Sequence, residues 1–304
     1  MFTVMLQMSF LVAVGCLWKR SAPKHISALS HRRALTDLVF YILLPALVLN
    51  VIWTVPFDVN TLKISLTALS RLVTALLLMW LCCQFLNVTR PQQGALLLAA
   101  AFPNATNLGL PVTTEVLGNW TQAVVLNFDL FAFTPALFSF GMLLAQYYGD
   151  AKVKVHPLRE LAKVPPLWAL LLASVLNVLE VPQPLMLQHA LTSLADGVVP
   201  LMLIALGMSL RWNTLKMQFL PMITAVCVIG LLCAPLAALG VASVLGLPTE
   251  TLKAVVLLSA MPSMVFGIIV CERYQLDSAL YAATVLVSSL LSILTLSAWF
   301  HYLT

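Results

Sequence analysis

The segment AAFPNATNLGLP, residues 100–111, interrupts a long apolar stretch and decides how this chain folds. Its two prolines each remove a backbone hydrogen-bond donor, and its glycine weakens the helical turn between them. Its asparagines and threonine can hydrogen-bond to the freed backbone or to a ligand. In a lipid bilayer, non-helical backbone is tolerated only where it is buried in protein or lines a wet cavity. A broken helix here therefore marks a candidate binding site.

The composition around this segment is that of a multi-pass membrane protein. The chain has 304 residues, of which 61% are hydrophobic and 9% are charged, and its mean hydropathy is +0.99. Soluble domains are about 45 to 50% apolar. Because a spanning helix needs about 20 residues, there is room for roughly ten spans and no separate soluble domain. The net charge of +5 is no evidence for nucleic-acid binding, because the basic residues must first be sorted by loop.

We predict an all-α membrane protein with ten transmembrane helices, the fourth and ninth of which are broken. The spans cover residues 2–18, 34–53, 64–86, 92–117, 122–147, 164–179, 187–210, 219–245, 251–271 and 278–302.

The distribution of basic residues supports this assignment. Thirteen of the 16 lysines and arginines fall on one side of the predicted membrane: Lys19, Arg20, Lys24, Arg32, Arg33, Arg90, Lys152, Lys154, Arg159, Lys163, Arg211, Lys216 and Arg273. The other side holds Lys63, Arg71 and Lys253. The positive-inside rule places the basic loops in the cytoplasm. We therefore expect a protein of the cell (inner) membrane with both termini outside.

The two halves of the chain resemble each other. Without gaps, residues 86–103 align with residues 245–262, which pairs Pro103 with Pro262. Five spans per half is an odd number, so the second half must be inverted in the membrane. We predict a first repeat over 1–147, a cytoplasmic connecting loop over 148–163 and a second repeat over 164–304. Inverted repeats with matching helix breaks are typical of secondary transporters whose site lies between the breaks.

The first break supplies three candidate substrate-binding residues, Asn104, Asn107 and Pro111. An asparagine amide can donate to a carboxylate while its oxygen caps the following half-helix. The positive end of that half-helix, near Pro111, favours an anion. The alternative is that both amides only satisfy the local backbone.

The second break and the second span supply the remaining candidates. Ser259, Pro262 and Ser263 interrupt the ninth span, although serines in membrane helices also bond back to their own carbonyls. Asn50 follows Pro45 by about one turn, and the sequence leaves its direction open.

Two ionisable residues lie inside predicted spans. Asp129 lies about two turns into the fifth span, and a charged group at that depth is costly, so we predict a role in proton or ion coupling. The alternative is a structural hydrogen bond to the broken helix. For Arg71, in the third span, we favour a side chain that extends to the outer lipid headgroups.

These features together resemble the auxin efflux carrier family, including its bacterial malonate-carrier-like members and, more distantly, the plant PIN carriers. The resemblance is carried by LVFYILLPAL at 38–47, NATNLGLP at 104–111, residues 262–274, SLLS at 289–292 and Trp299. It implies ten helices in two inverted repeats with crossing breaks, as in bile-acid sodium symporters and sodium/proton antiporters. The chain departs from the plant carriers in its short connecting loop and in Ser263, where they have an asparagine.

The resemblance also implies a function. We predict a secondary active transporter of small organic anions such as malonate, malate, lactate or auxin-like weak acids, working by alternating access. Its partners are the bilayer, the anion, H+ or Na+ as an undecided coupling ion, and a second copy in a homodimer. Spans one, two, six and seven form the expected scaffold. We expect no enzyme activity, cofactor, metal site or nucleic-acid binding. A channel or a ligand sensor with the same fold is the alternative.

Overall fold

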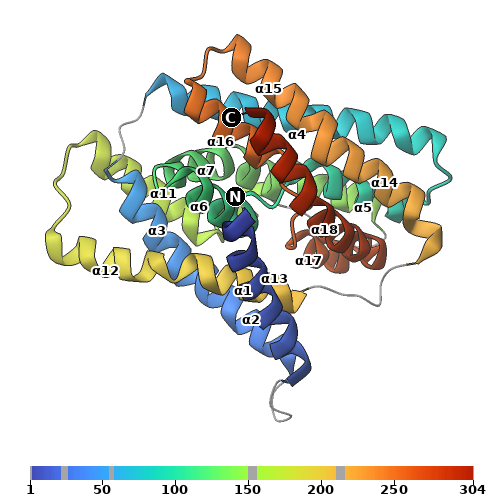
Figure 1. Ribbon diagram of the computed structural model, residues 1–304, viewed down its shortest axis with the longest axis horizontal. Coiled ribbons are helices and arrows are strands. Elements are labelled where there is room, and N and C mark those ends of the chain that lie inside the picture. Colours follow the sequence, from blue (N-terminus) through green and yellow to red (C-terminus); the bar gives the residue numbers. More distant parts are fainter. Residues whose placement is uncertain (1, 22–26, 55–57, 150–155, 210–215, 304) are drawn as a thin grey trace.

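The computed structural model describes all residues except 1, 22–26, 55–57, 150–155, 210–215 and 304, and these described residues fold into helices (Figure 1). The first half contains α1 (Phe2–Ser21), α2 (Ala28–Leu38), α3 (Leu44–Ile52), α4 (Val59–Phe85), α5 (Arg90–Ala101), α6 (Leu110–Leu117), α7 (Thr121–Phe128), α8 (Thr134–Ala136) and α9 (Met142–Tyr148). The second half contains α10 (Pro157–Leu161), α11 (Pro165–Val178), α12 (Leu185–Asp196), α13 (Val198–Ser209), α14 (Leu220–Val228), α15 (Ala234–Val244), α16 (Thr249–Ser259), α17 (Gly267–Tyr274) and α18 (Ser278–Leu303).

Six continuous helical segments among the described residues are long and apolar enough to cross a membrane, which bears out a multi-pass membrane protein. They are Ser30–Ile52, Val59–Phe85, Thr121–Tyr148, Leu185–Ser209, Met217–Val244 and Ser278–Leu303. The breaks predicted in the fourth and ninth spans are present. The first separates the end of α5 at Ala101 from the start of α6 at Leu110, and the second separates the end of α16 at Ser259 from the start of α17 at Gly267. The count of ten spans and the inverted repeat stay predictions.

Several prolines are accommodated by a wider π-helical turn just before them. Such turns occur at η1 (Val39–Leu43), η2 (Ala105–Gly109), η3 (Asp129–Phe133) and η7 (Ile229–Cys233), and each is followed two residues later by a proline. A proline inside a helix lacks a donor and collides with the carbonyl four residues earlier. In each case that carbonyl lies within the π turn, so the helix continues past the proline instead of ending. A further π turn, η4 (Leu137–Gly141), follows η3.

The helices pack into two groups. In the first group α1 packs on α13, and α3 packs on both α11 and α12. In the second group α4 packs on α5 and α15, while α18 packs on α5 and α14. Figure 1 shows α12, α2 and α1 on the opposite side of the molecule from α14 and α15. The first group contains the segments that correspond to predicted spans one, two, six and seven.

The first group is held by unusually close backbone contact between α1 and α13. A Cβ atom added at Gly15 would lie 2.1 Å from the carbonyl oxygen of Ile204, and one added at Gly207 would lie 2.0 Å from that of Val12. The thiol of Cys16 donates to the Gly207 carbonyl at 3.3 Å. Small residues that let helix backbones approach closely are a common device of membrane helix packing.

The predicted connecting loop at 148–163 contains the short helix α10. Four of the basic residues used for the orientation, Lys24, Lys152, Lys154 and Arg211, lie outside the described residues.

Candidate functional site

The two broken helices cross and bind each other through their backbones. The amide of Asn104 donates to the carbonyl of Pro262 at 2.7 Å, and the amide of Met264 donates to the carbonyl of Phe102 at 3.1 Å. Pro103 and Ser263 thus form an antiparallel bridge between the breaks. Prolines and extended residues leave backbone amides and carbonyls in each break without helical hydrogen bonds. The two breaks therefore supply hydrogen-bond partners to each other. Pro103 and Pro262, which the sequence alignment pairs, both lie at this crossing.

Arg71 of α4 reinforces this crossing, which differs from the expected extension to the headgroups. Its side chain is 1% exposed. Nη1 donates to the carbonyls of Ala100, at 2.9 Å, and Ala101 at the end of α5. Nε donates to the carbonyl of Ser259 at the end of α16, at 3.3 Å. The guanidinium therefore joins the C-terminal ends of both half-helices, because the last carbonyls of a helix have no partner within it.

Four of the predicted substrate-binding residues lie outside the lining of the cavity described below. Pro262 accepts the hydrogen bond from Asn104, and Ser263 donates its hydroxyl to the carbonyl of Ala99 at 2.8 Å. Ser259 donates back to Val255 at 2.8 Å. Pro111 is buried near the start of α6.

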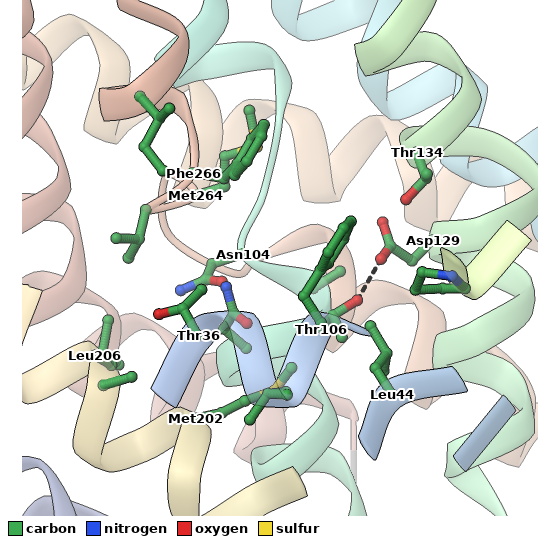
Figure 2. Close-up of a pocket in the computed structure, with 18 of the residues that line it drawn as sticks. Thr36, Leu44, Asn104, Thr106, Asp129, Thr134, Met202, Leu206, Met264 and Phe266 are labelled. Atoms are coloured by element: carbon green, nitrogen blue, oxygen red, sulfur yellow. Dashed lines mark hydrogen bonds between the residues drawn. The ribbon is translucent and has the colours of Figure 1, made fainter. Parts of the chain in front are cut away.

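A cavity of about 220 Å³ lies between the two helix groups, next to the first break. It is lined from the first group by residues of α2, η1, α3, α11 and α13, and from the second group by η2, η3, η4 and the segment that opens α17. Figure 2 shows Met202 and Leu206 of α13 on one side and Met264 and Phe266 on another, with the first break between them. Ligand sites are commonly mostly apolar with a few placed polar groups, as here.

Asn104 and Asn107 both line this cavity. Asn104 is 2% exposed, and its side-chain amide nitrogen is buried without a hydrogen-bond partner among the described residues. The sequence suggested that its side chain caps the following half-helix, but the side chain makes no such bond. Its backbone carbonyl instead accepts from the amides of Leu108, at 3.2 Å, and Gly109, at 3.0 Å. An unpaired buried donor is costly, so this amide is ready to bind an acceptor.

Asp129 also lines the cavity, at the start of η3. The hydroxyl of Thr106, in the first break, donates to its carboxylate, and Figure 2 shows the hydroxyl of Thr134 pointing toward the same group. From the sequence, the alternative to a coupling role for Asp129 was a structural hydrogen bond to the broken helix. Thr106 supplies such a hydrogen bond. Thr106 was visible in the break but was not singled out as a site residue.

Three charged residues and a threonine around the start of the second predicted span also line the cavity. Arg32, Arg33, Thr36 and Asp37 belong to α2 and approach from the first group. Asn50 lies elsewhere: its amide donates to the hydroxyl of Thr192 at 3.3 Å, which joins α3 to α12.

This fold and site define a class: a multi-pass membrane protein with two crossing helix breaks beside a cavity that separates two helix groups, the architecture of a membrane transporter. Comparison with known families agrees. The sequence profile described as "Membrane transport protein" matches residues 1–148 and 151–300. The chain therefore belongs to this family, the auxin efflux carrier family.

Two curated archaeal relatives carry the same description of class. An uncharacterized transporter of Methanothermobacter thermautotrophicus is 29% identical over 204 residues, which are 67% of this chain and 66% of the relative. An uncharacterized transporter of Methanocaldococcus jannaschii is 23% identical over 291 residues, which are 88% of this chain and 89% of the relative. The branch of the family to which the chain belongs stays a prediction.

Proposed function

We propose that this protein is a secondary active transporter that carries small organic anions, mono- or dicarboxylates such as malonate, malate, lactate or auxin-like weak acids, by alternating access. The observation that carries the proposal is the buried side-chain amide of Asn104, which has no hydrogen-bond partner among the described residues, beside a cavity of about 220 Å³. A carboxylate oxygen is the acceptor that this donor lacks. A small acid suits the volume, whereas a large amphipathic substrate does not.

The charges around the cavity favour an anion. Arg32 and Arg33 line it from α2, and the start of the half-helix after the first break adds the positive end of a helix dipole. Asp37 and Asp129 are the acidic residues of the lining. A protonated Asp129 would remove one negative charge when the acid binds, which would link proton and substrate movement.

The location of the cavity between two helix groups suggests how access alternates. The group that contains both breaks would move against the group built from α1, α3, α11, α12 and α13, as repeats move in related transporter architectures. Arg32 and Arg33 of α2 stand at the end of the predicted second span that the positive-inside rule puts in the cytoplasm. We therefore assign the cavity to the inward-facing state of a protein in the cell membrane with both termini outside.

The experiment is a thermal-shift screen of the purified protein with malonate, malate, lactate, succinate and indole-acetate, beside Asn104→Ala and Asn107→Ala. We expect one acid to stabilise the wild type and Asn104→Ala to lose at least about tenfold in affinity, because about 1.5 kcal/mol of hydrogen bonding to a charged acceptor is removed. Ser259 does not line the cavity, and its hydroxyl donates within its own helix to Val255, so Ser259→Ala is the matched control and should bind as the wild type does.

A counterflow assay in proteoliposomes separates the transporter from a channel or a sensor. A carrier exchanges labelled acid inside for unlabelled acid outside with saturable kinetics, whereas a channel gives no counterflow and a sensor gives no flux. Equal stabilisation of the wild type and Asn104→Ala by the same acid would move the site away from the first break. The absence of any response to the acids would reject the anion proposal.

A further inference from the structure

The crossing of the broken helices contains a second feature that the transport proposal does not use. The C-terminal ends of α5 and α16 point into one region, and each ends in carbonyls without helical partners. The negative end of each helix dipole adds to the negative potential there. Carbonyls of unwound backbone and the C-terminal ends of half-helices are the groups that bind Na+ in transporters with broken helices.

In this protein a side chain fills that region. Arg71 donates to the carbonyls of Ala100 and Ala101 from one half-helix and to that of Ser259 from the other. Its guanidinium carbon lies 5.9 Å from the centroid of the Phe133 ring, a distance at which a cation and an aromatic face attract each other. Among the described residues, no carboxylate forms an ion pair with it. Carbonyl dipoles and an aromatic face, rather than an acid, therefore surround its charge.

Arginine suits this place better than a mobile ion would. The guanidinium stays charged under all physiological conditions, and its planar set of donors can reach two helices at once. It is tethered to α4, so its local concentration is fixed and needs no supply from solution. It lies outside the lining of the cavity, behind the first break.

We propose that Arg71 is a built-in cation that takes the place of Na+ at the crossing, so that the protein binds no alkali cation there and transports without sodium. This inference deepens the proposed function, because the coupling ion was left open between H+ and Na+. Only the statement that transport proceeds without sodium rests on the proposed function. The cation site itself can be tested without any substrate.

The test measures the melting temperature of the purified full chain, without any acid, in NaCl, LiCl or choline chloride at one ionic strength. The wild type should melt at the same temperature in all three salts. Arg71→Ser should melt lower, and NaCl or low-millimolar guanidinium should restore about 5 °C at saturation, because a ligand that binds only the folded state stabilises it. Arg71→Lys keeps a charge and should show little response.

Arg90→Ser is the matched control. Arg90 also donates to a backbone carbonyl, that of Tyr147 at 3.0 Å, and also lies over an aromatic ring, but its residue is exposed. Its loss should create no dependence on the cation.

Stabilisation of the wild type by Na+ relative to choline would overturn the inference, and so would a folded Arg71→Ser variant that responds to neither Na+ nor guanidinium. If Arg71→Ser does not fold, the wild-type comparison still decides between the two outcomes. A failure of every acid to bind would reject the proposed function and leave this result unchanged.

Discussion

At the scale of single residues, the contact between Thr106 and Asp129 links the first break to an ionisable group. Thr106 donates to one carboxylate oxygen and holds the group in place, and a protonated Asp129 would keep an acceptor oxygen for this contact while gaining a donor of its own. We expect Asp129→Asn to remove the response of transport to a pH gradient. The rate of acid uptake driven by the gradient should fall to the rate without a gradient, while counterflow at equal pH persists. Proteoliposomes with an imposed pH difference measure both.

Asp37→Asn is the control for this change, because Asp37 is the other carboxylate of the cavity lining. It should keep the response to the gradient. An Asp129→Asn variant that still accumulates acid in response to the gradient would rule out Asp129 as the coupling group.

Residue types in the sequence were enough to predict three residues that line the cavity. Asn104, Asn107 and Asp129 could be predicted because polar and ionisable side chains at membrane depth are energetically unfavourable unless they are paired or functional. The role of Arg71 could not, because the carbonyls that it binds, those of Ala100, Ala101 and Ser259, lie far from it in the sequence. Ser263 and Pro262 were visible for the same reason as Asn104, but they serve the backbone crossing.

At the scale of elements, the glycine contact between α1 and α13 makes a sharp prediction. Gly207→Ala places a methyl group within 2.0 Å of the Val12 carbonyl, so the two helices must separate. Overpacking of this kind costs about 1 to 3 kcal/mol, and we expect the melting temperature to fall by about 3 to 10 °C. A thermal melt of the purified protein measures this.

Gly240→Ala is the matched helical control, because no heavy atom lies within 4 Å of a Cβ atom at that position. It should leave the melting temperature unchanged or raise it slightly, since alanine favours a helix more than glycine does. Equal effects of the two substitutions would show that helix propensity, and not the contact of α1 with α13, sets the result.

The element boundaries show what the sequence could and could not predict. The two breaks followed from proline and glycine in an apolar stretch, because these residues disturb any helix. The π turns before Pro45, Pro135 and Pro235 were not predicted, because the same proline either ends a helix or is absorbed by a wider turn, and the packing around it decides which. The close contact of Gly15 and Gly207 joins residues far apart in the chain, so no local pattern reveals it.

At the scale of the whole molecule, α10 ties the connection between the halves to the second broken helix. Both terminal nitrogens of the Arg273 guanidinium, on α17, donate to the carboxylate of Glu160 on α10: Nη1 to Oε2 at 3.2 Å and Nη2 to Oε1 at 3.0 Å. Lys163 donates to Oε1 at 3.2 Å. Since α11 of the first group begins at Pro165, the chain passes between the two groups just after this contact.

This ion pair predicts how stability depends on pH. The hydrogen bonds from Arg273, opposed by partial burial, hold the pKa of Glu160 below its usual value. A carboxylate whose pKa is lowered by folding stabilises the protein above its unfolded pKa of about 4.3, and this contribution is lost as the pH falls through that value toward the lower folded pKa. Glu160→Gln should therefore melt about 2 °C below the wild type near pH 7, because a bidentate but partly solvated pair contributes about 0.5 to 1 kcal/mol. The gap should narrow near pH 4 and close only below the lowered folded pKa.

Thermal melts of both proteins across this pH range measure the gap. Glu250→Gln is the control, because Glu250 forms a pair with Lys253 three residues along the same helix, at 2.9 Å, but its side chain is 63% exposed. A pair so open to solvent contributes little, so its loss should change the melting temperature by less than about 1 °C at either pH. A Glu160→Gln gap that stays the same at pH 7 and pH 4 would mean that the connection between the halves is held by packing alone, with no electrostatic contribution from α10.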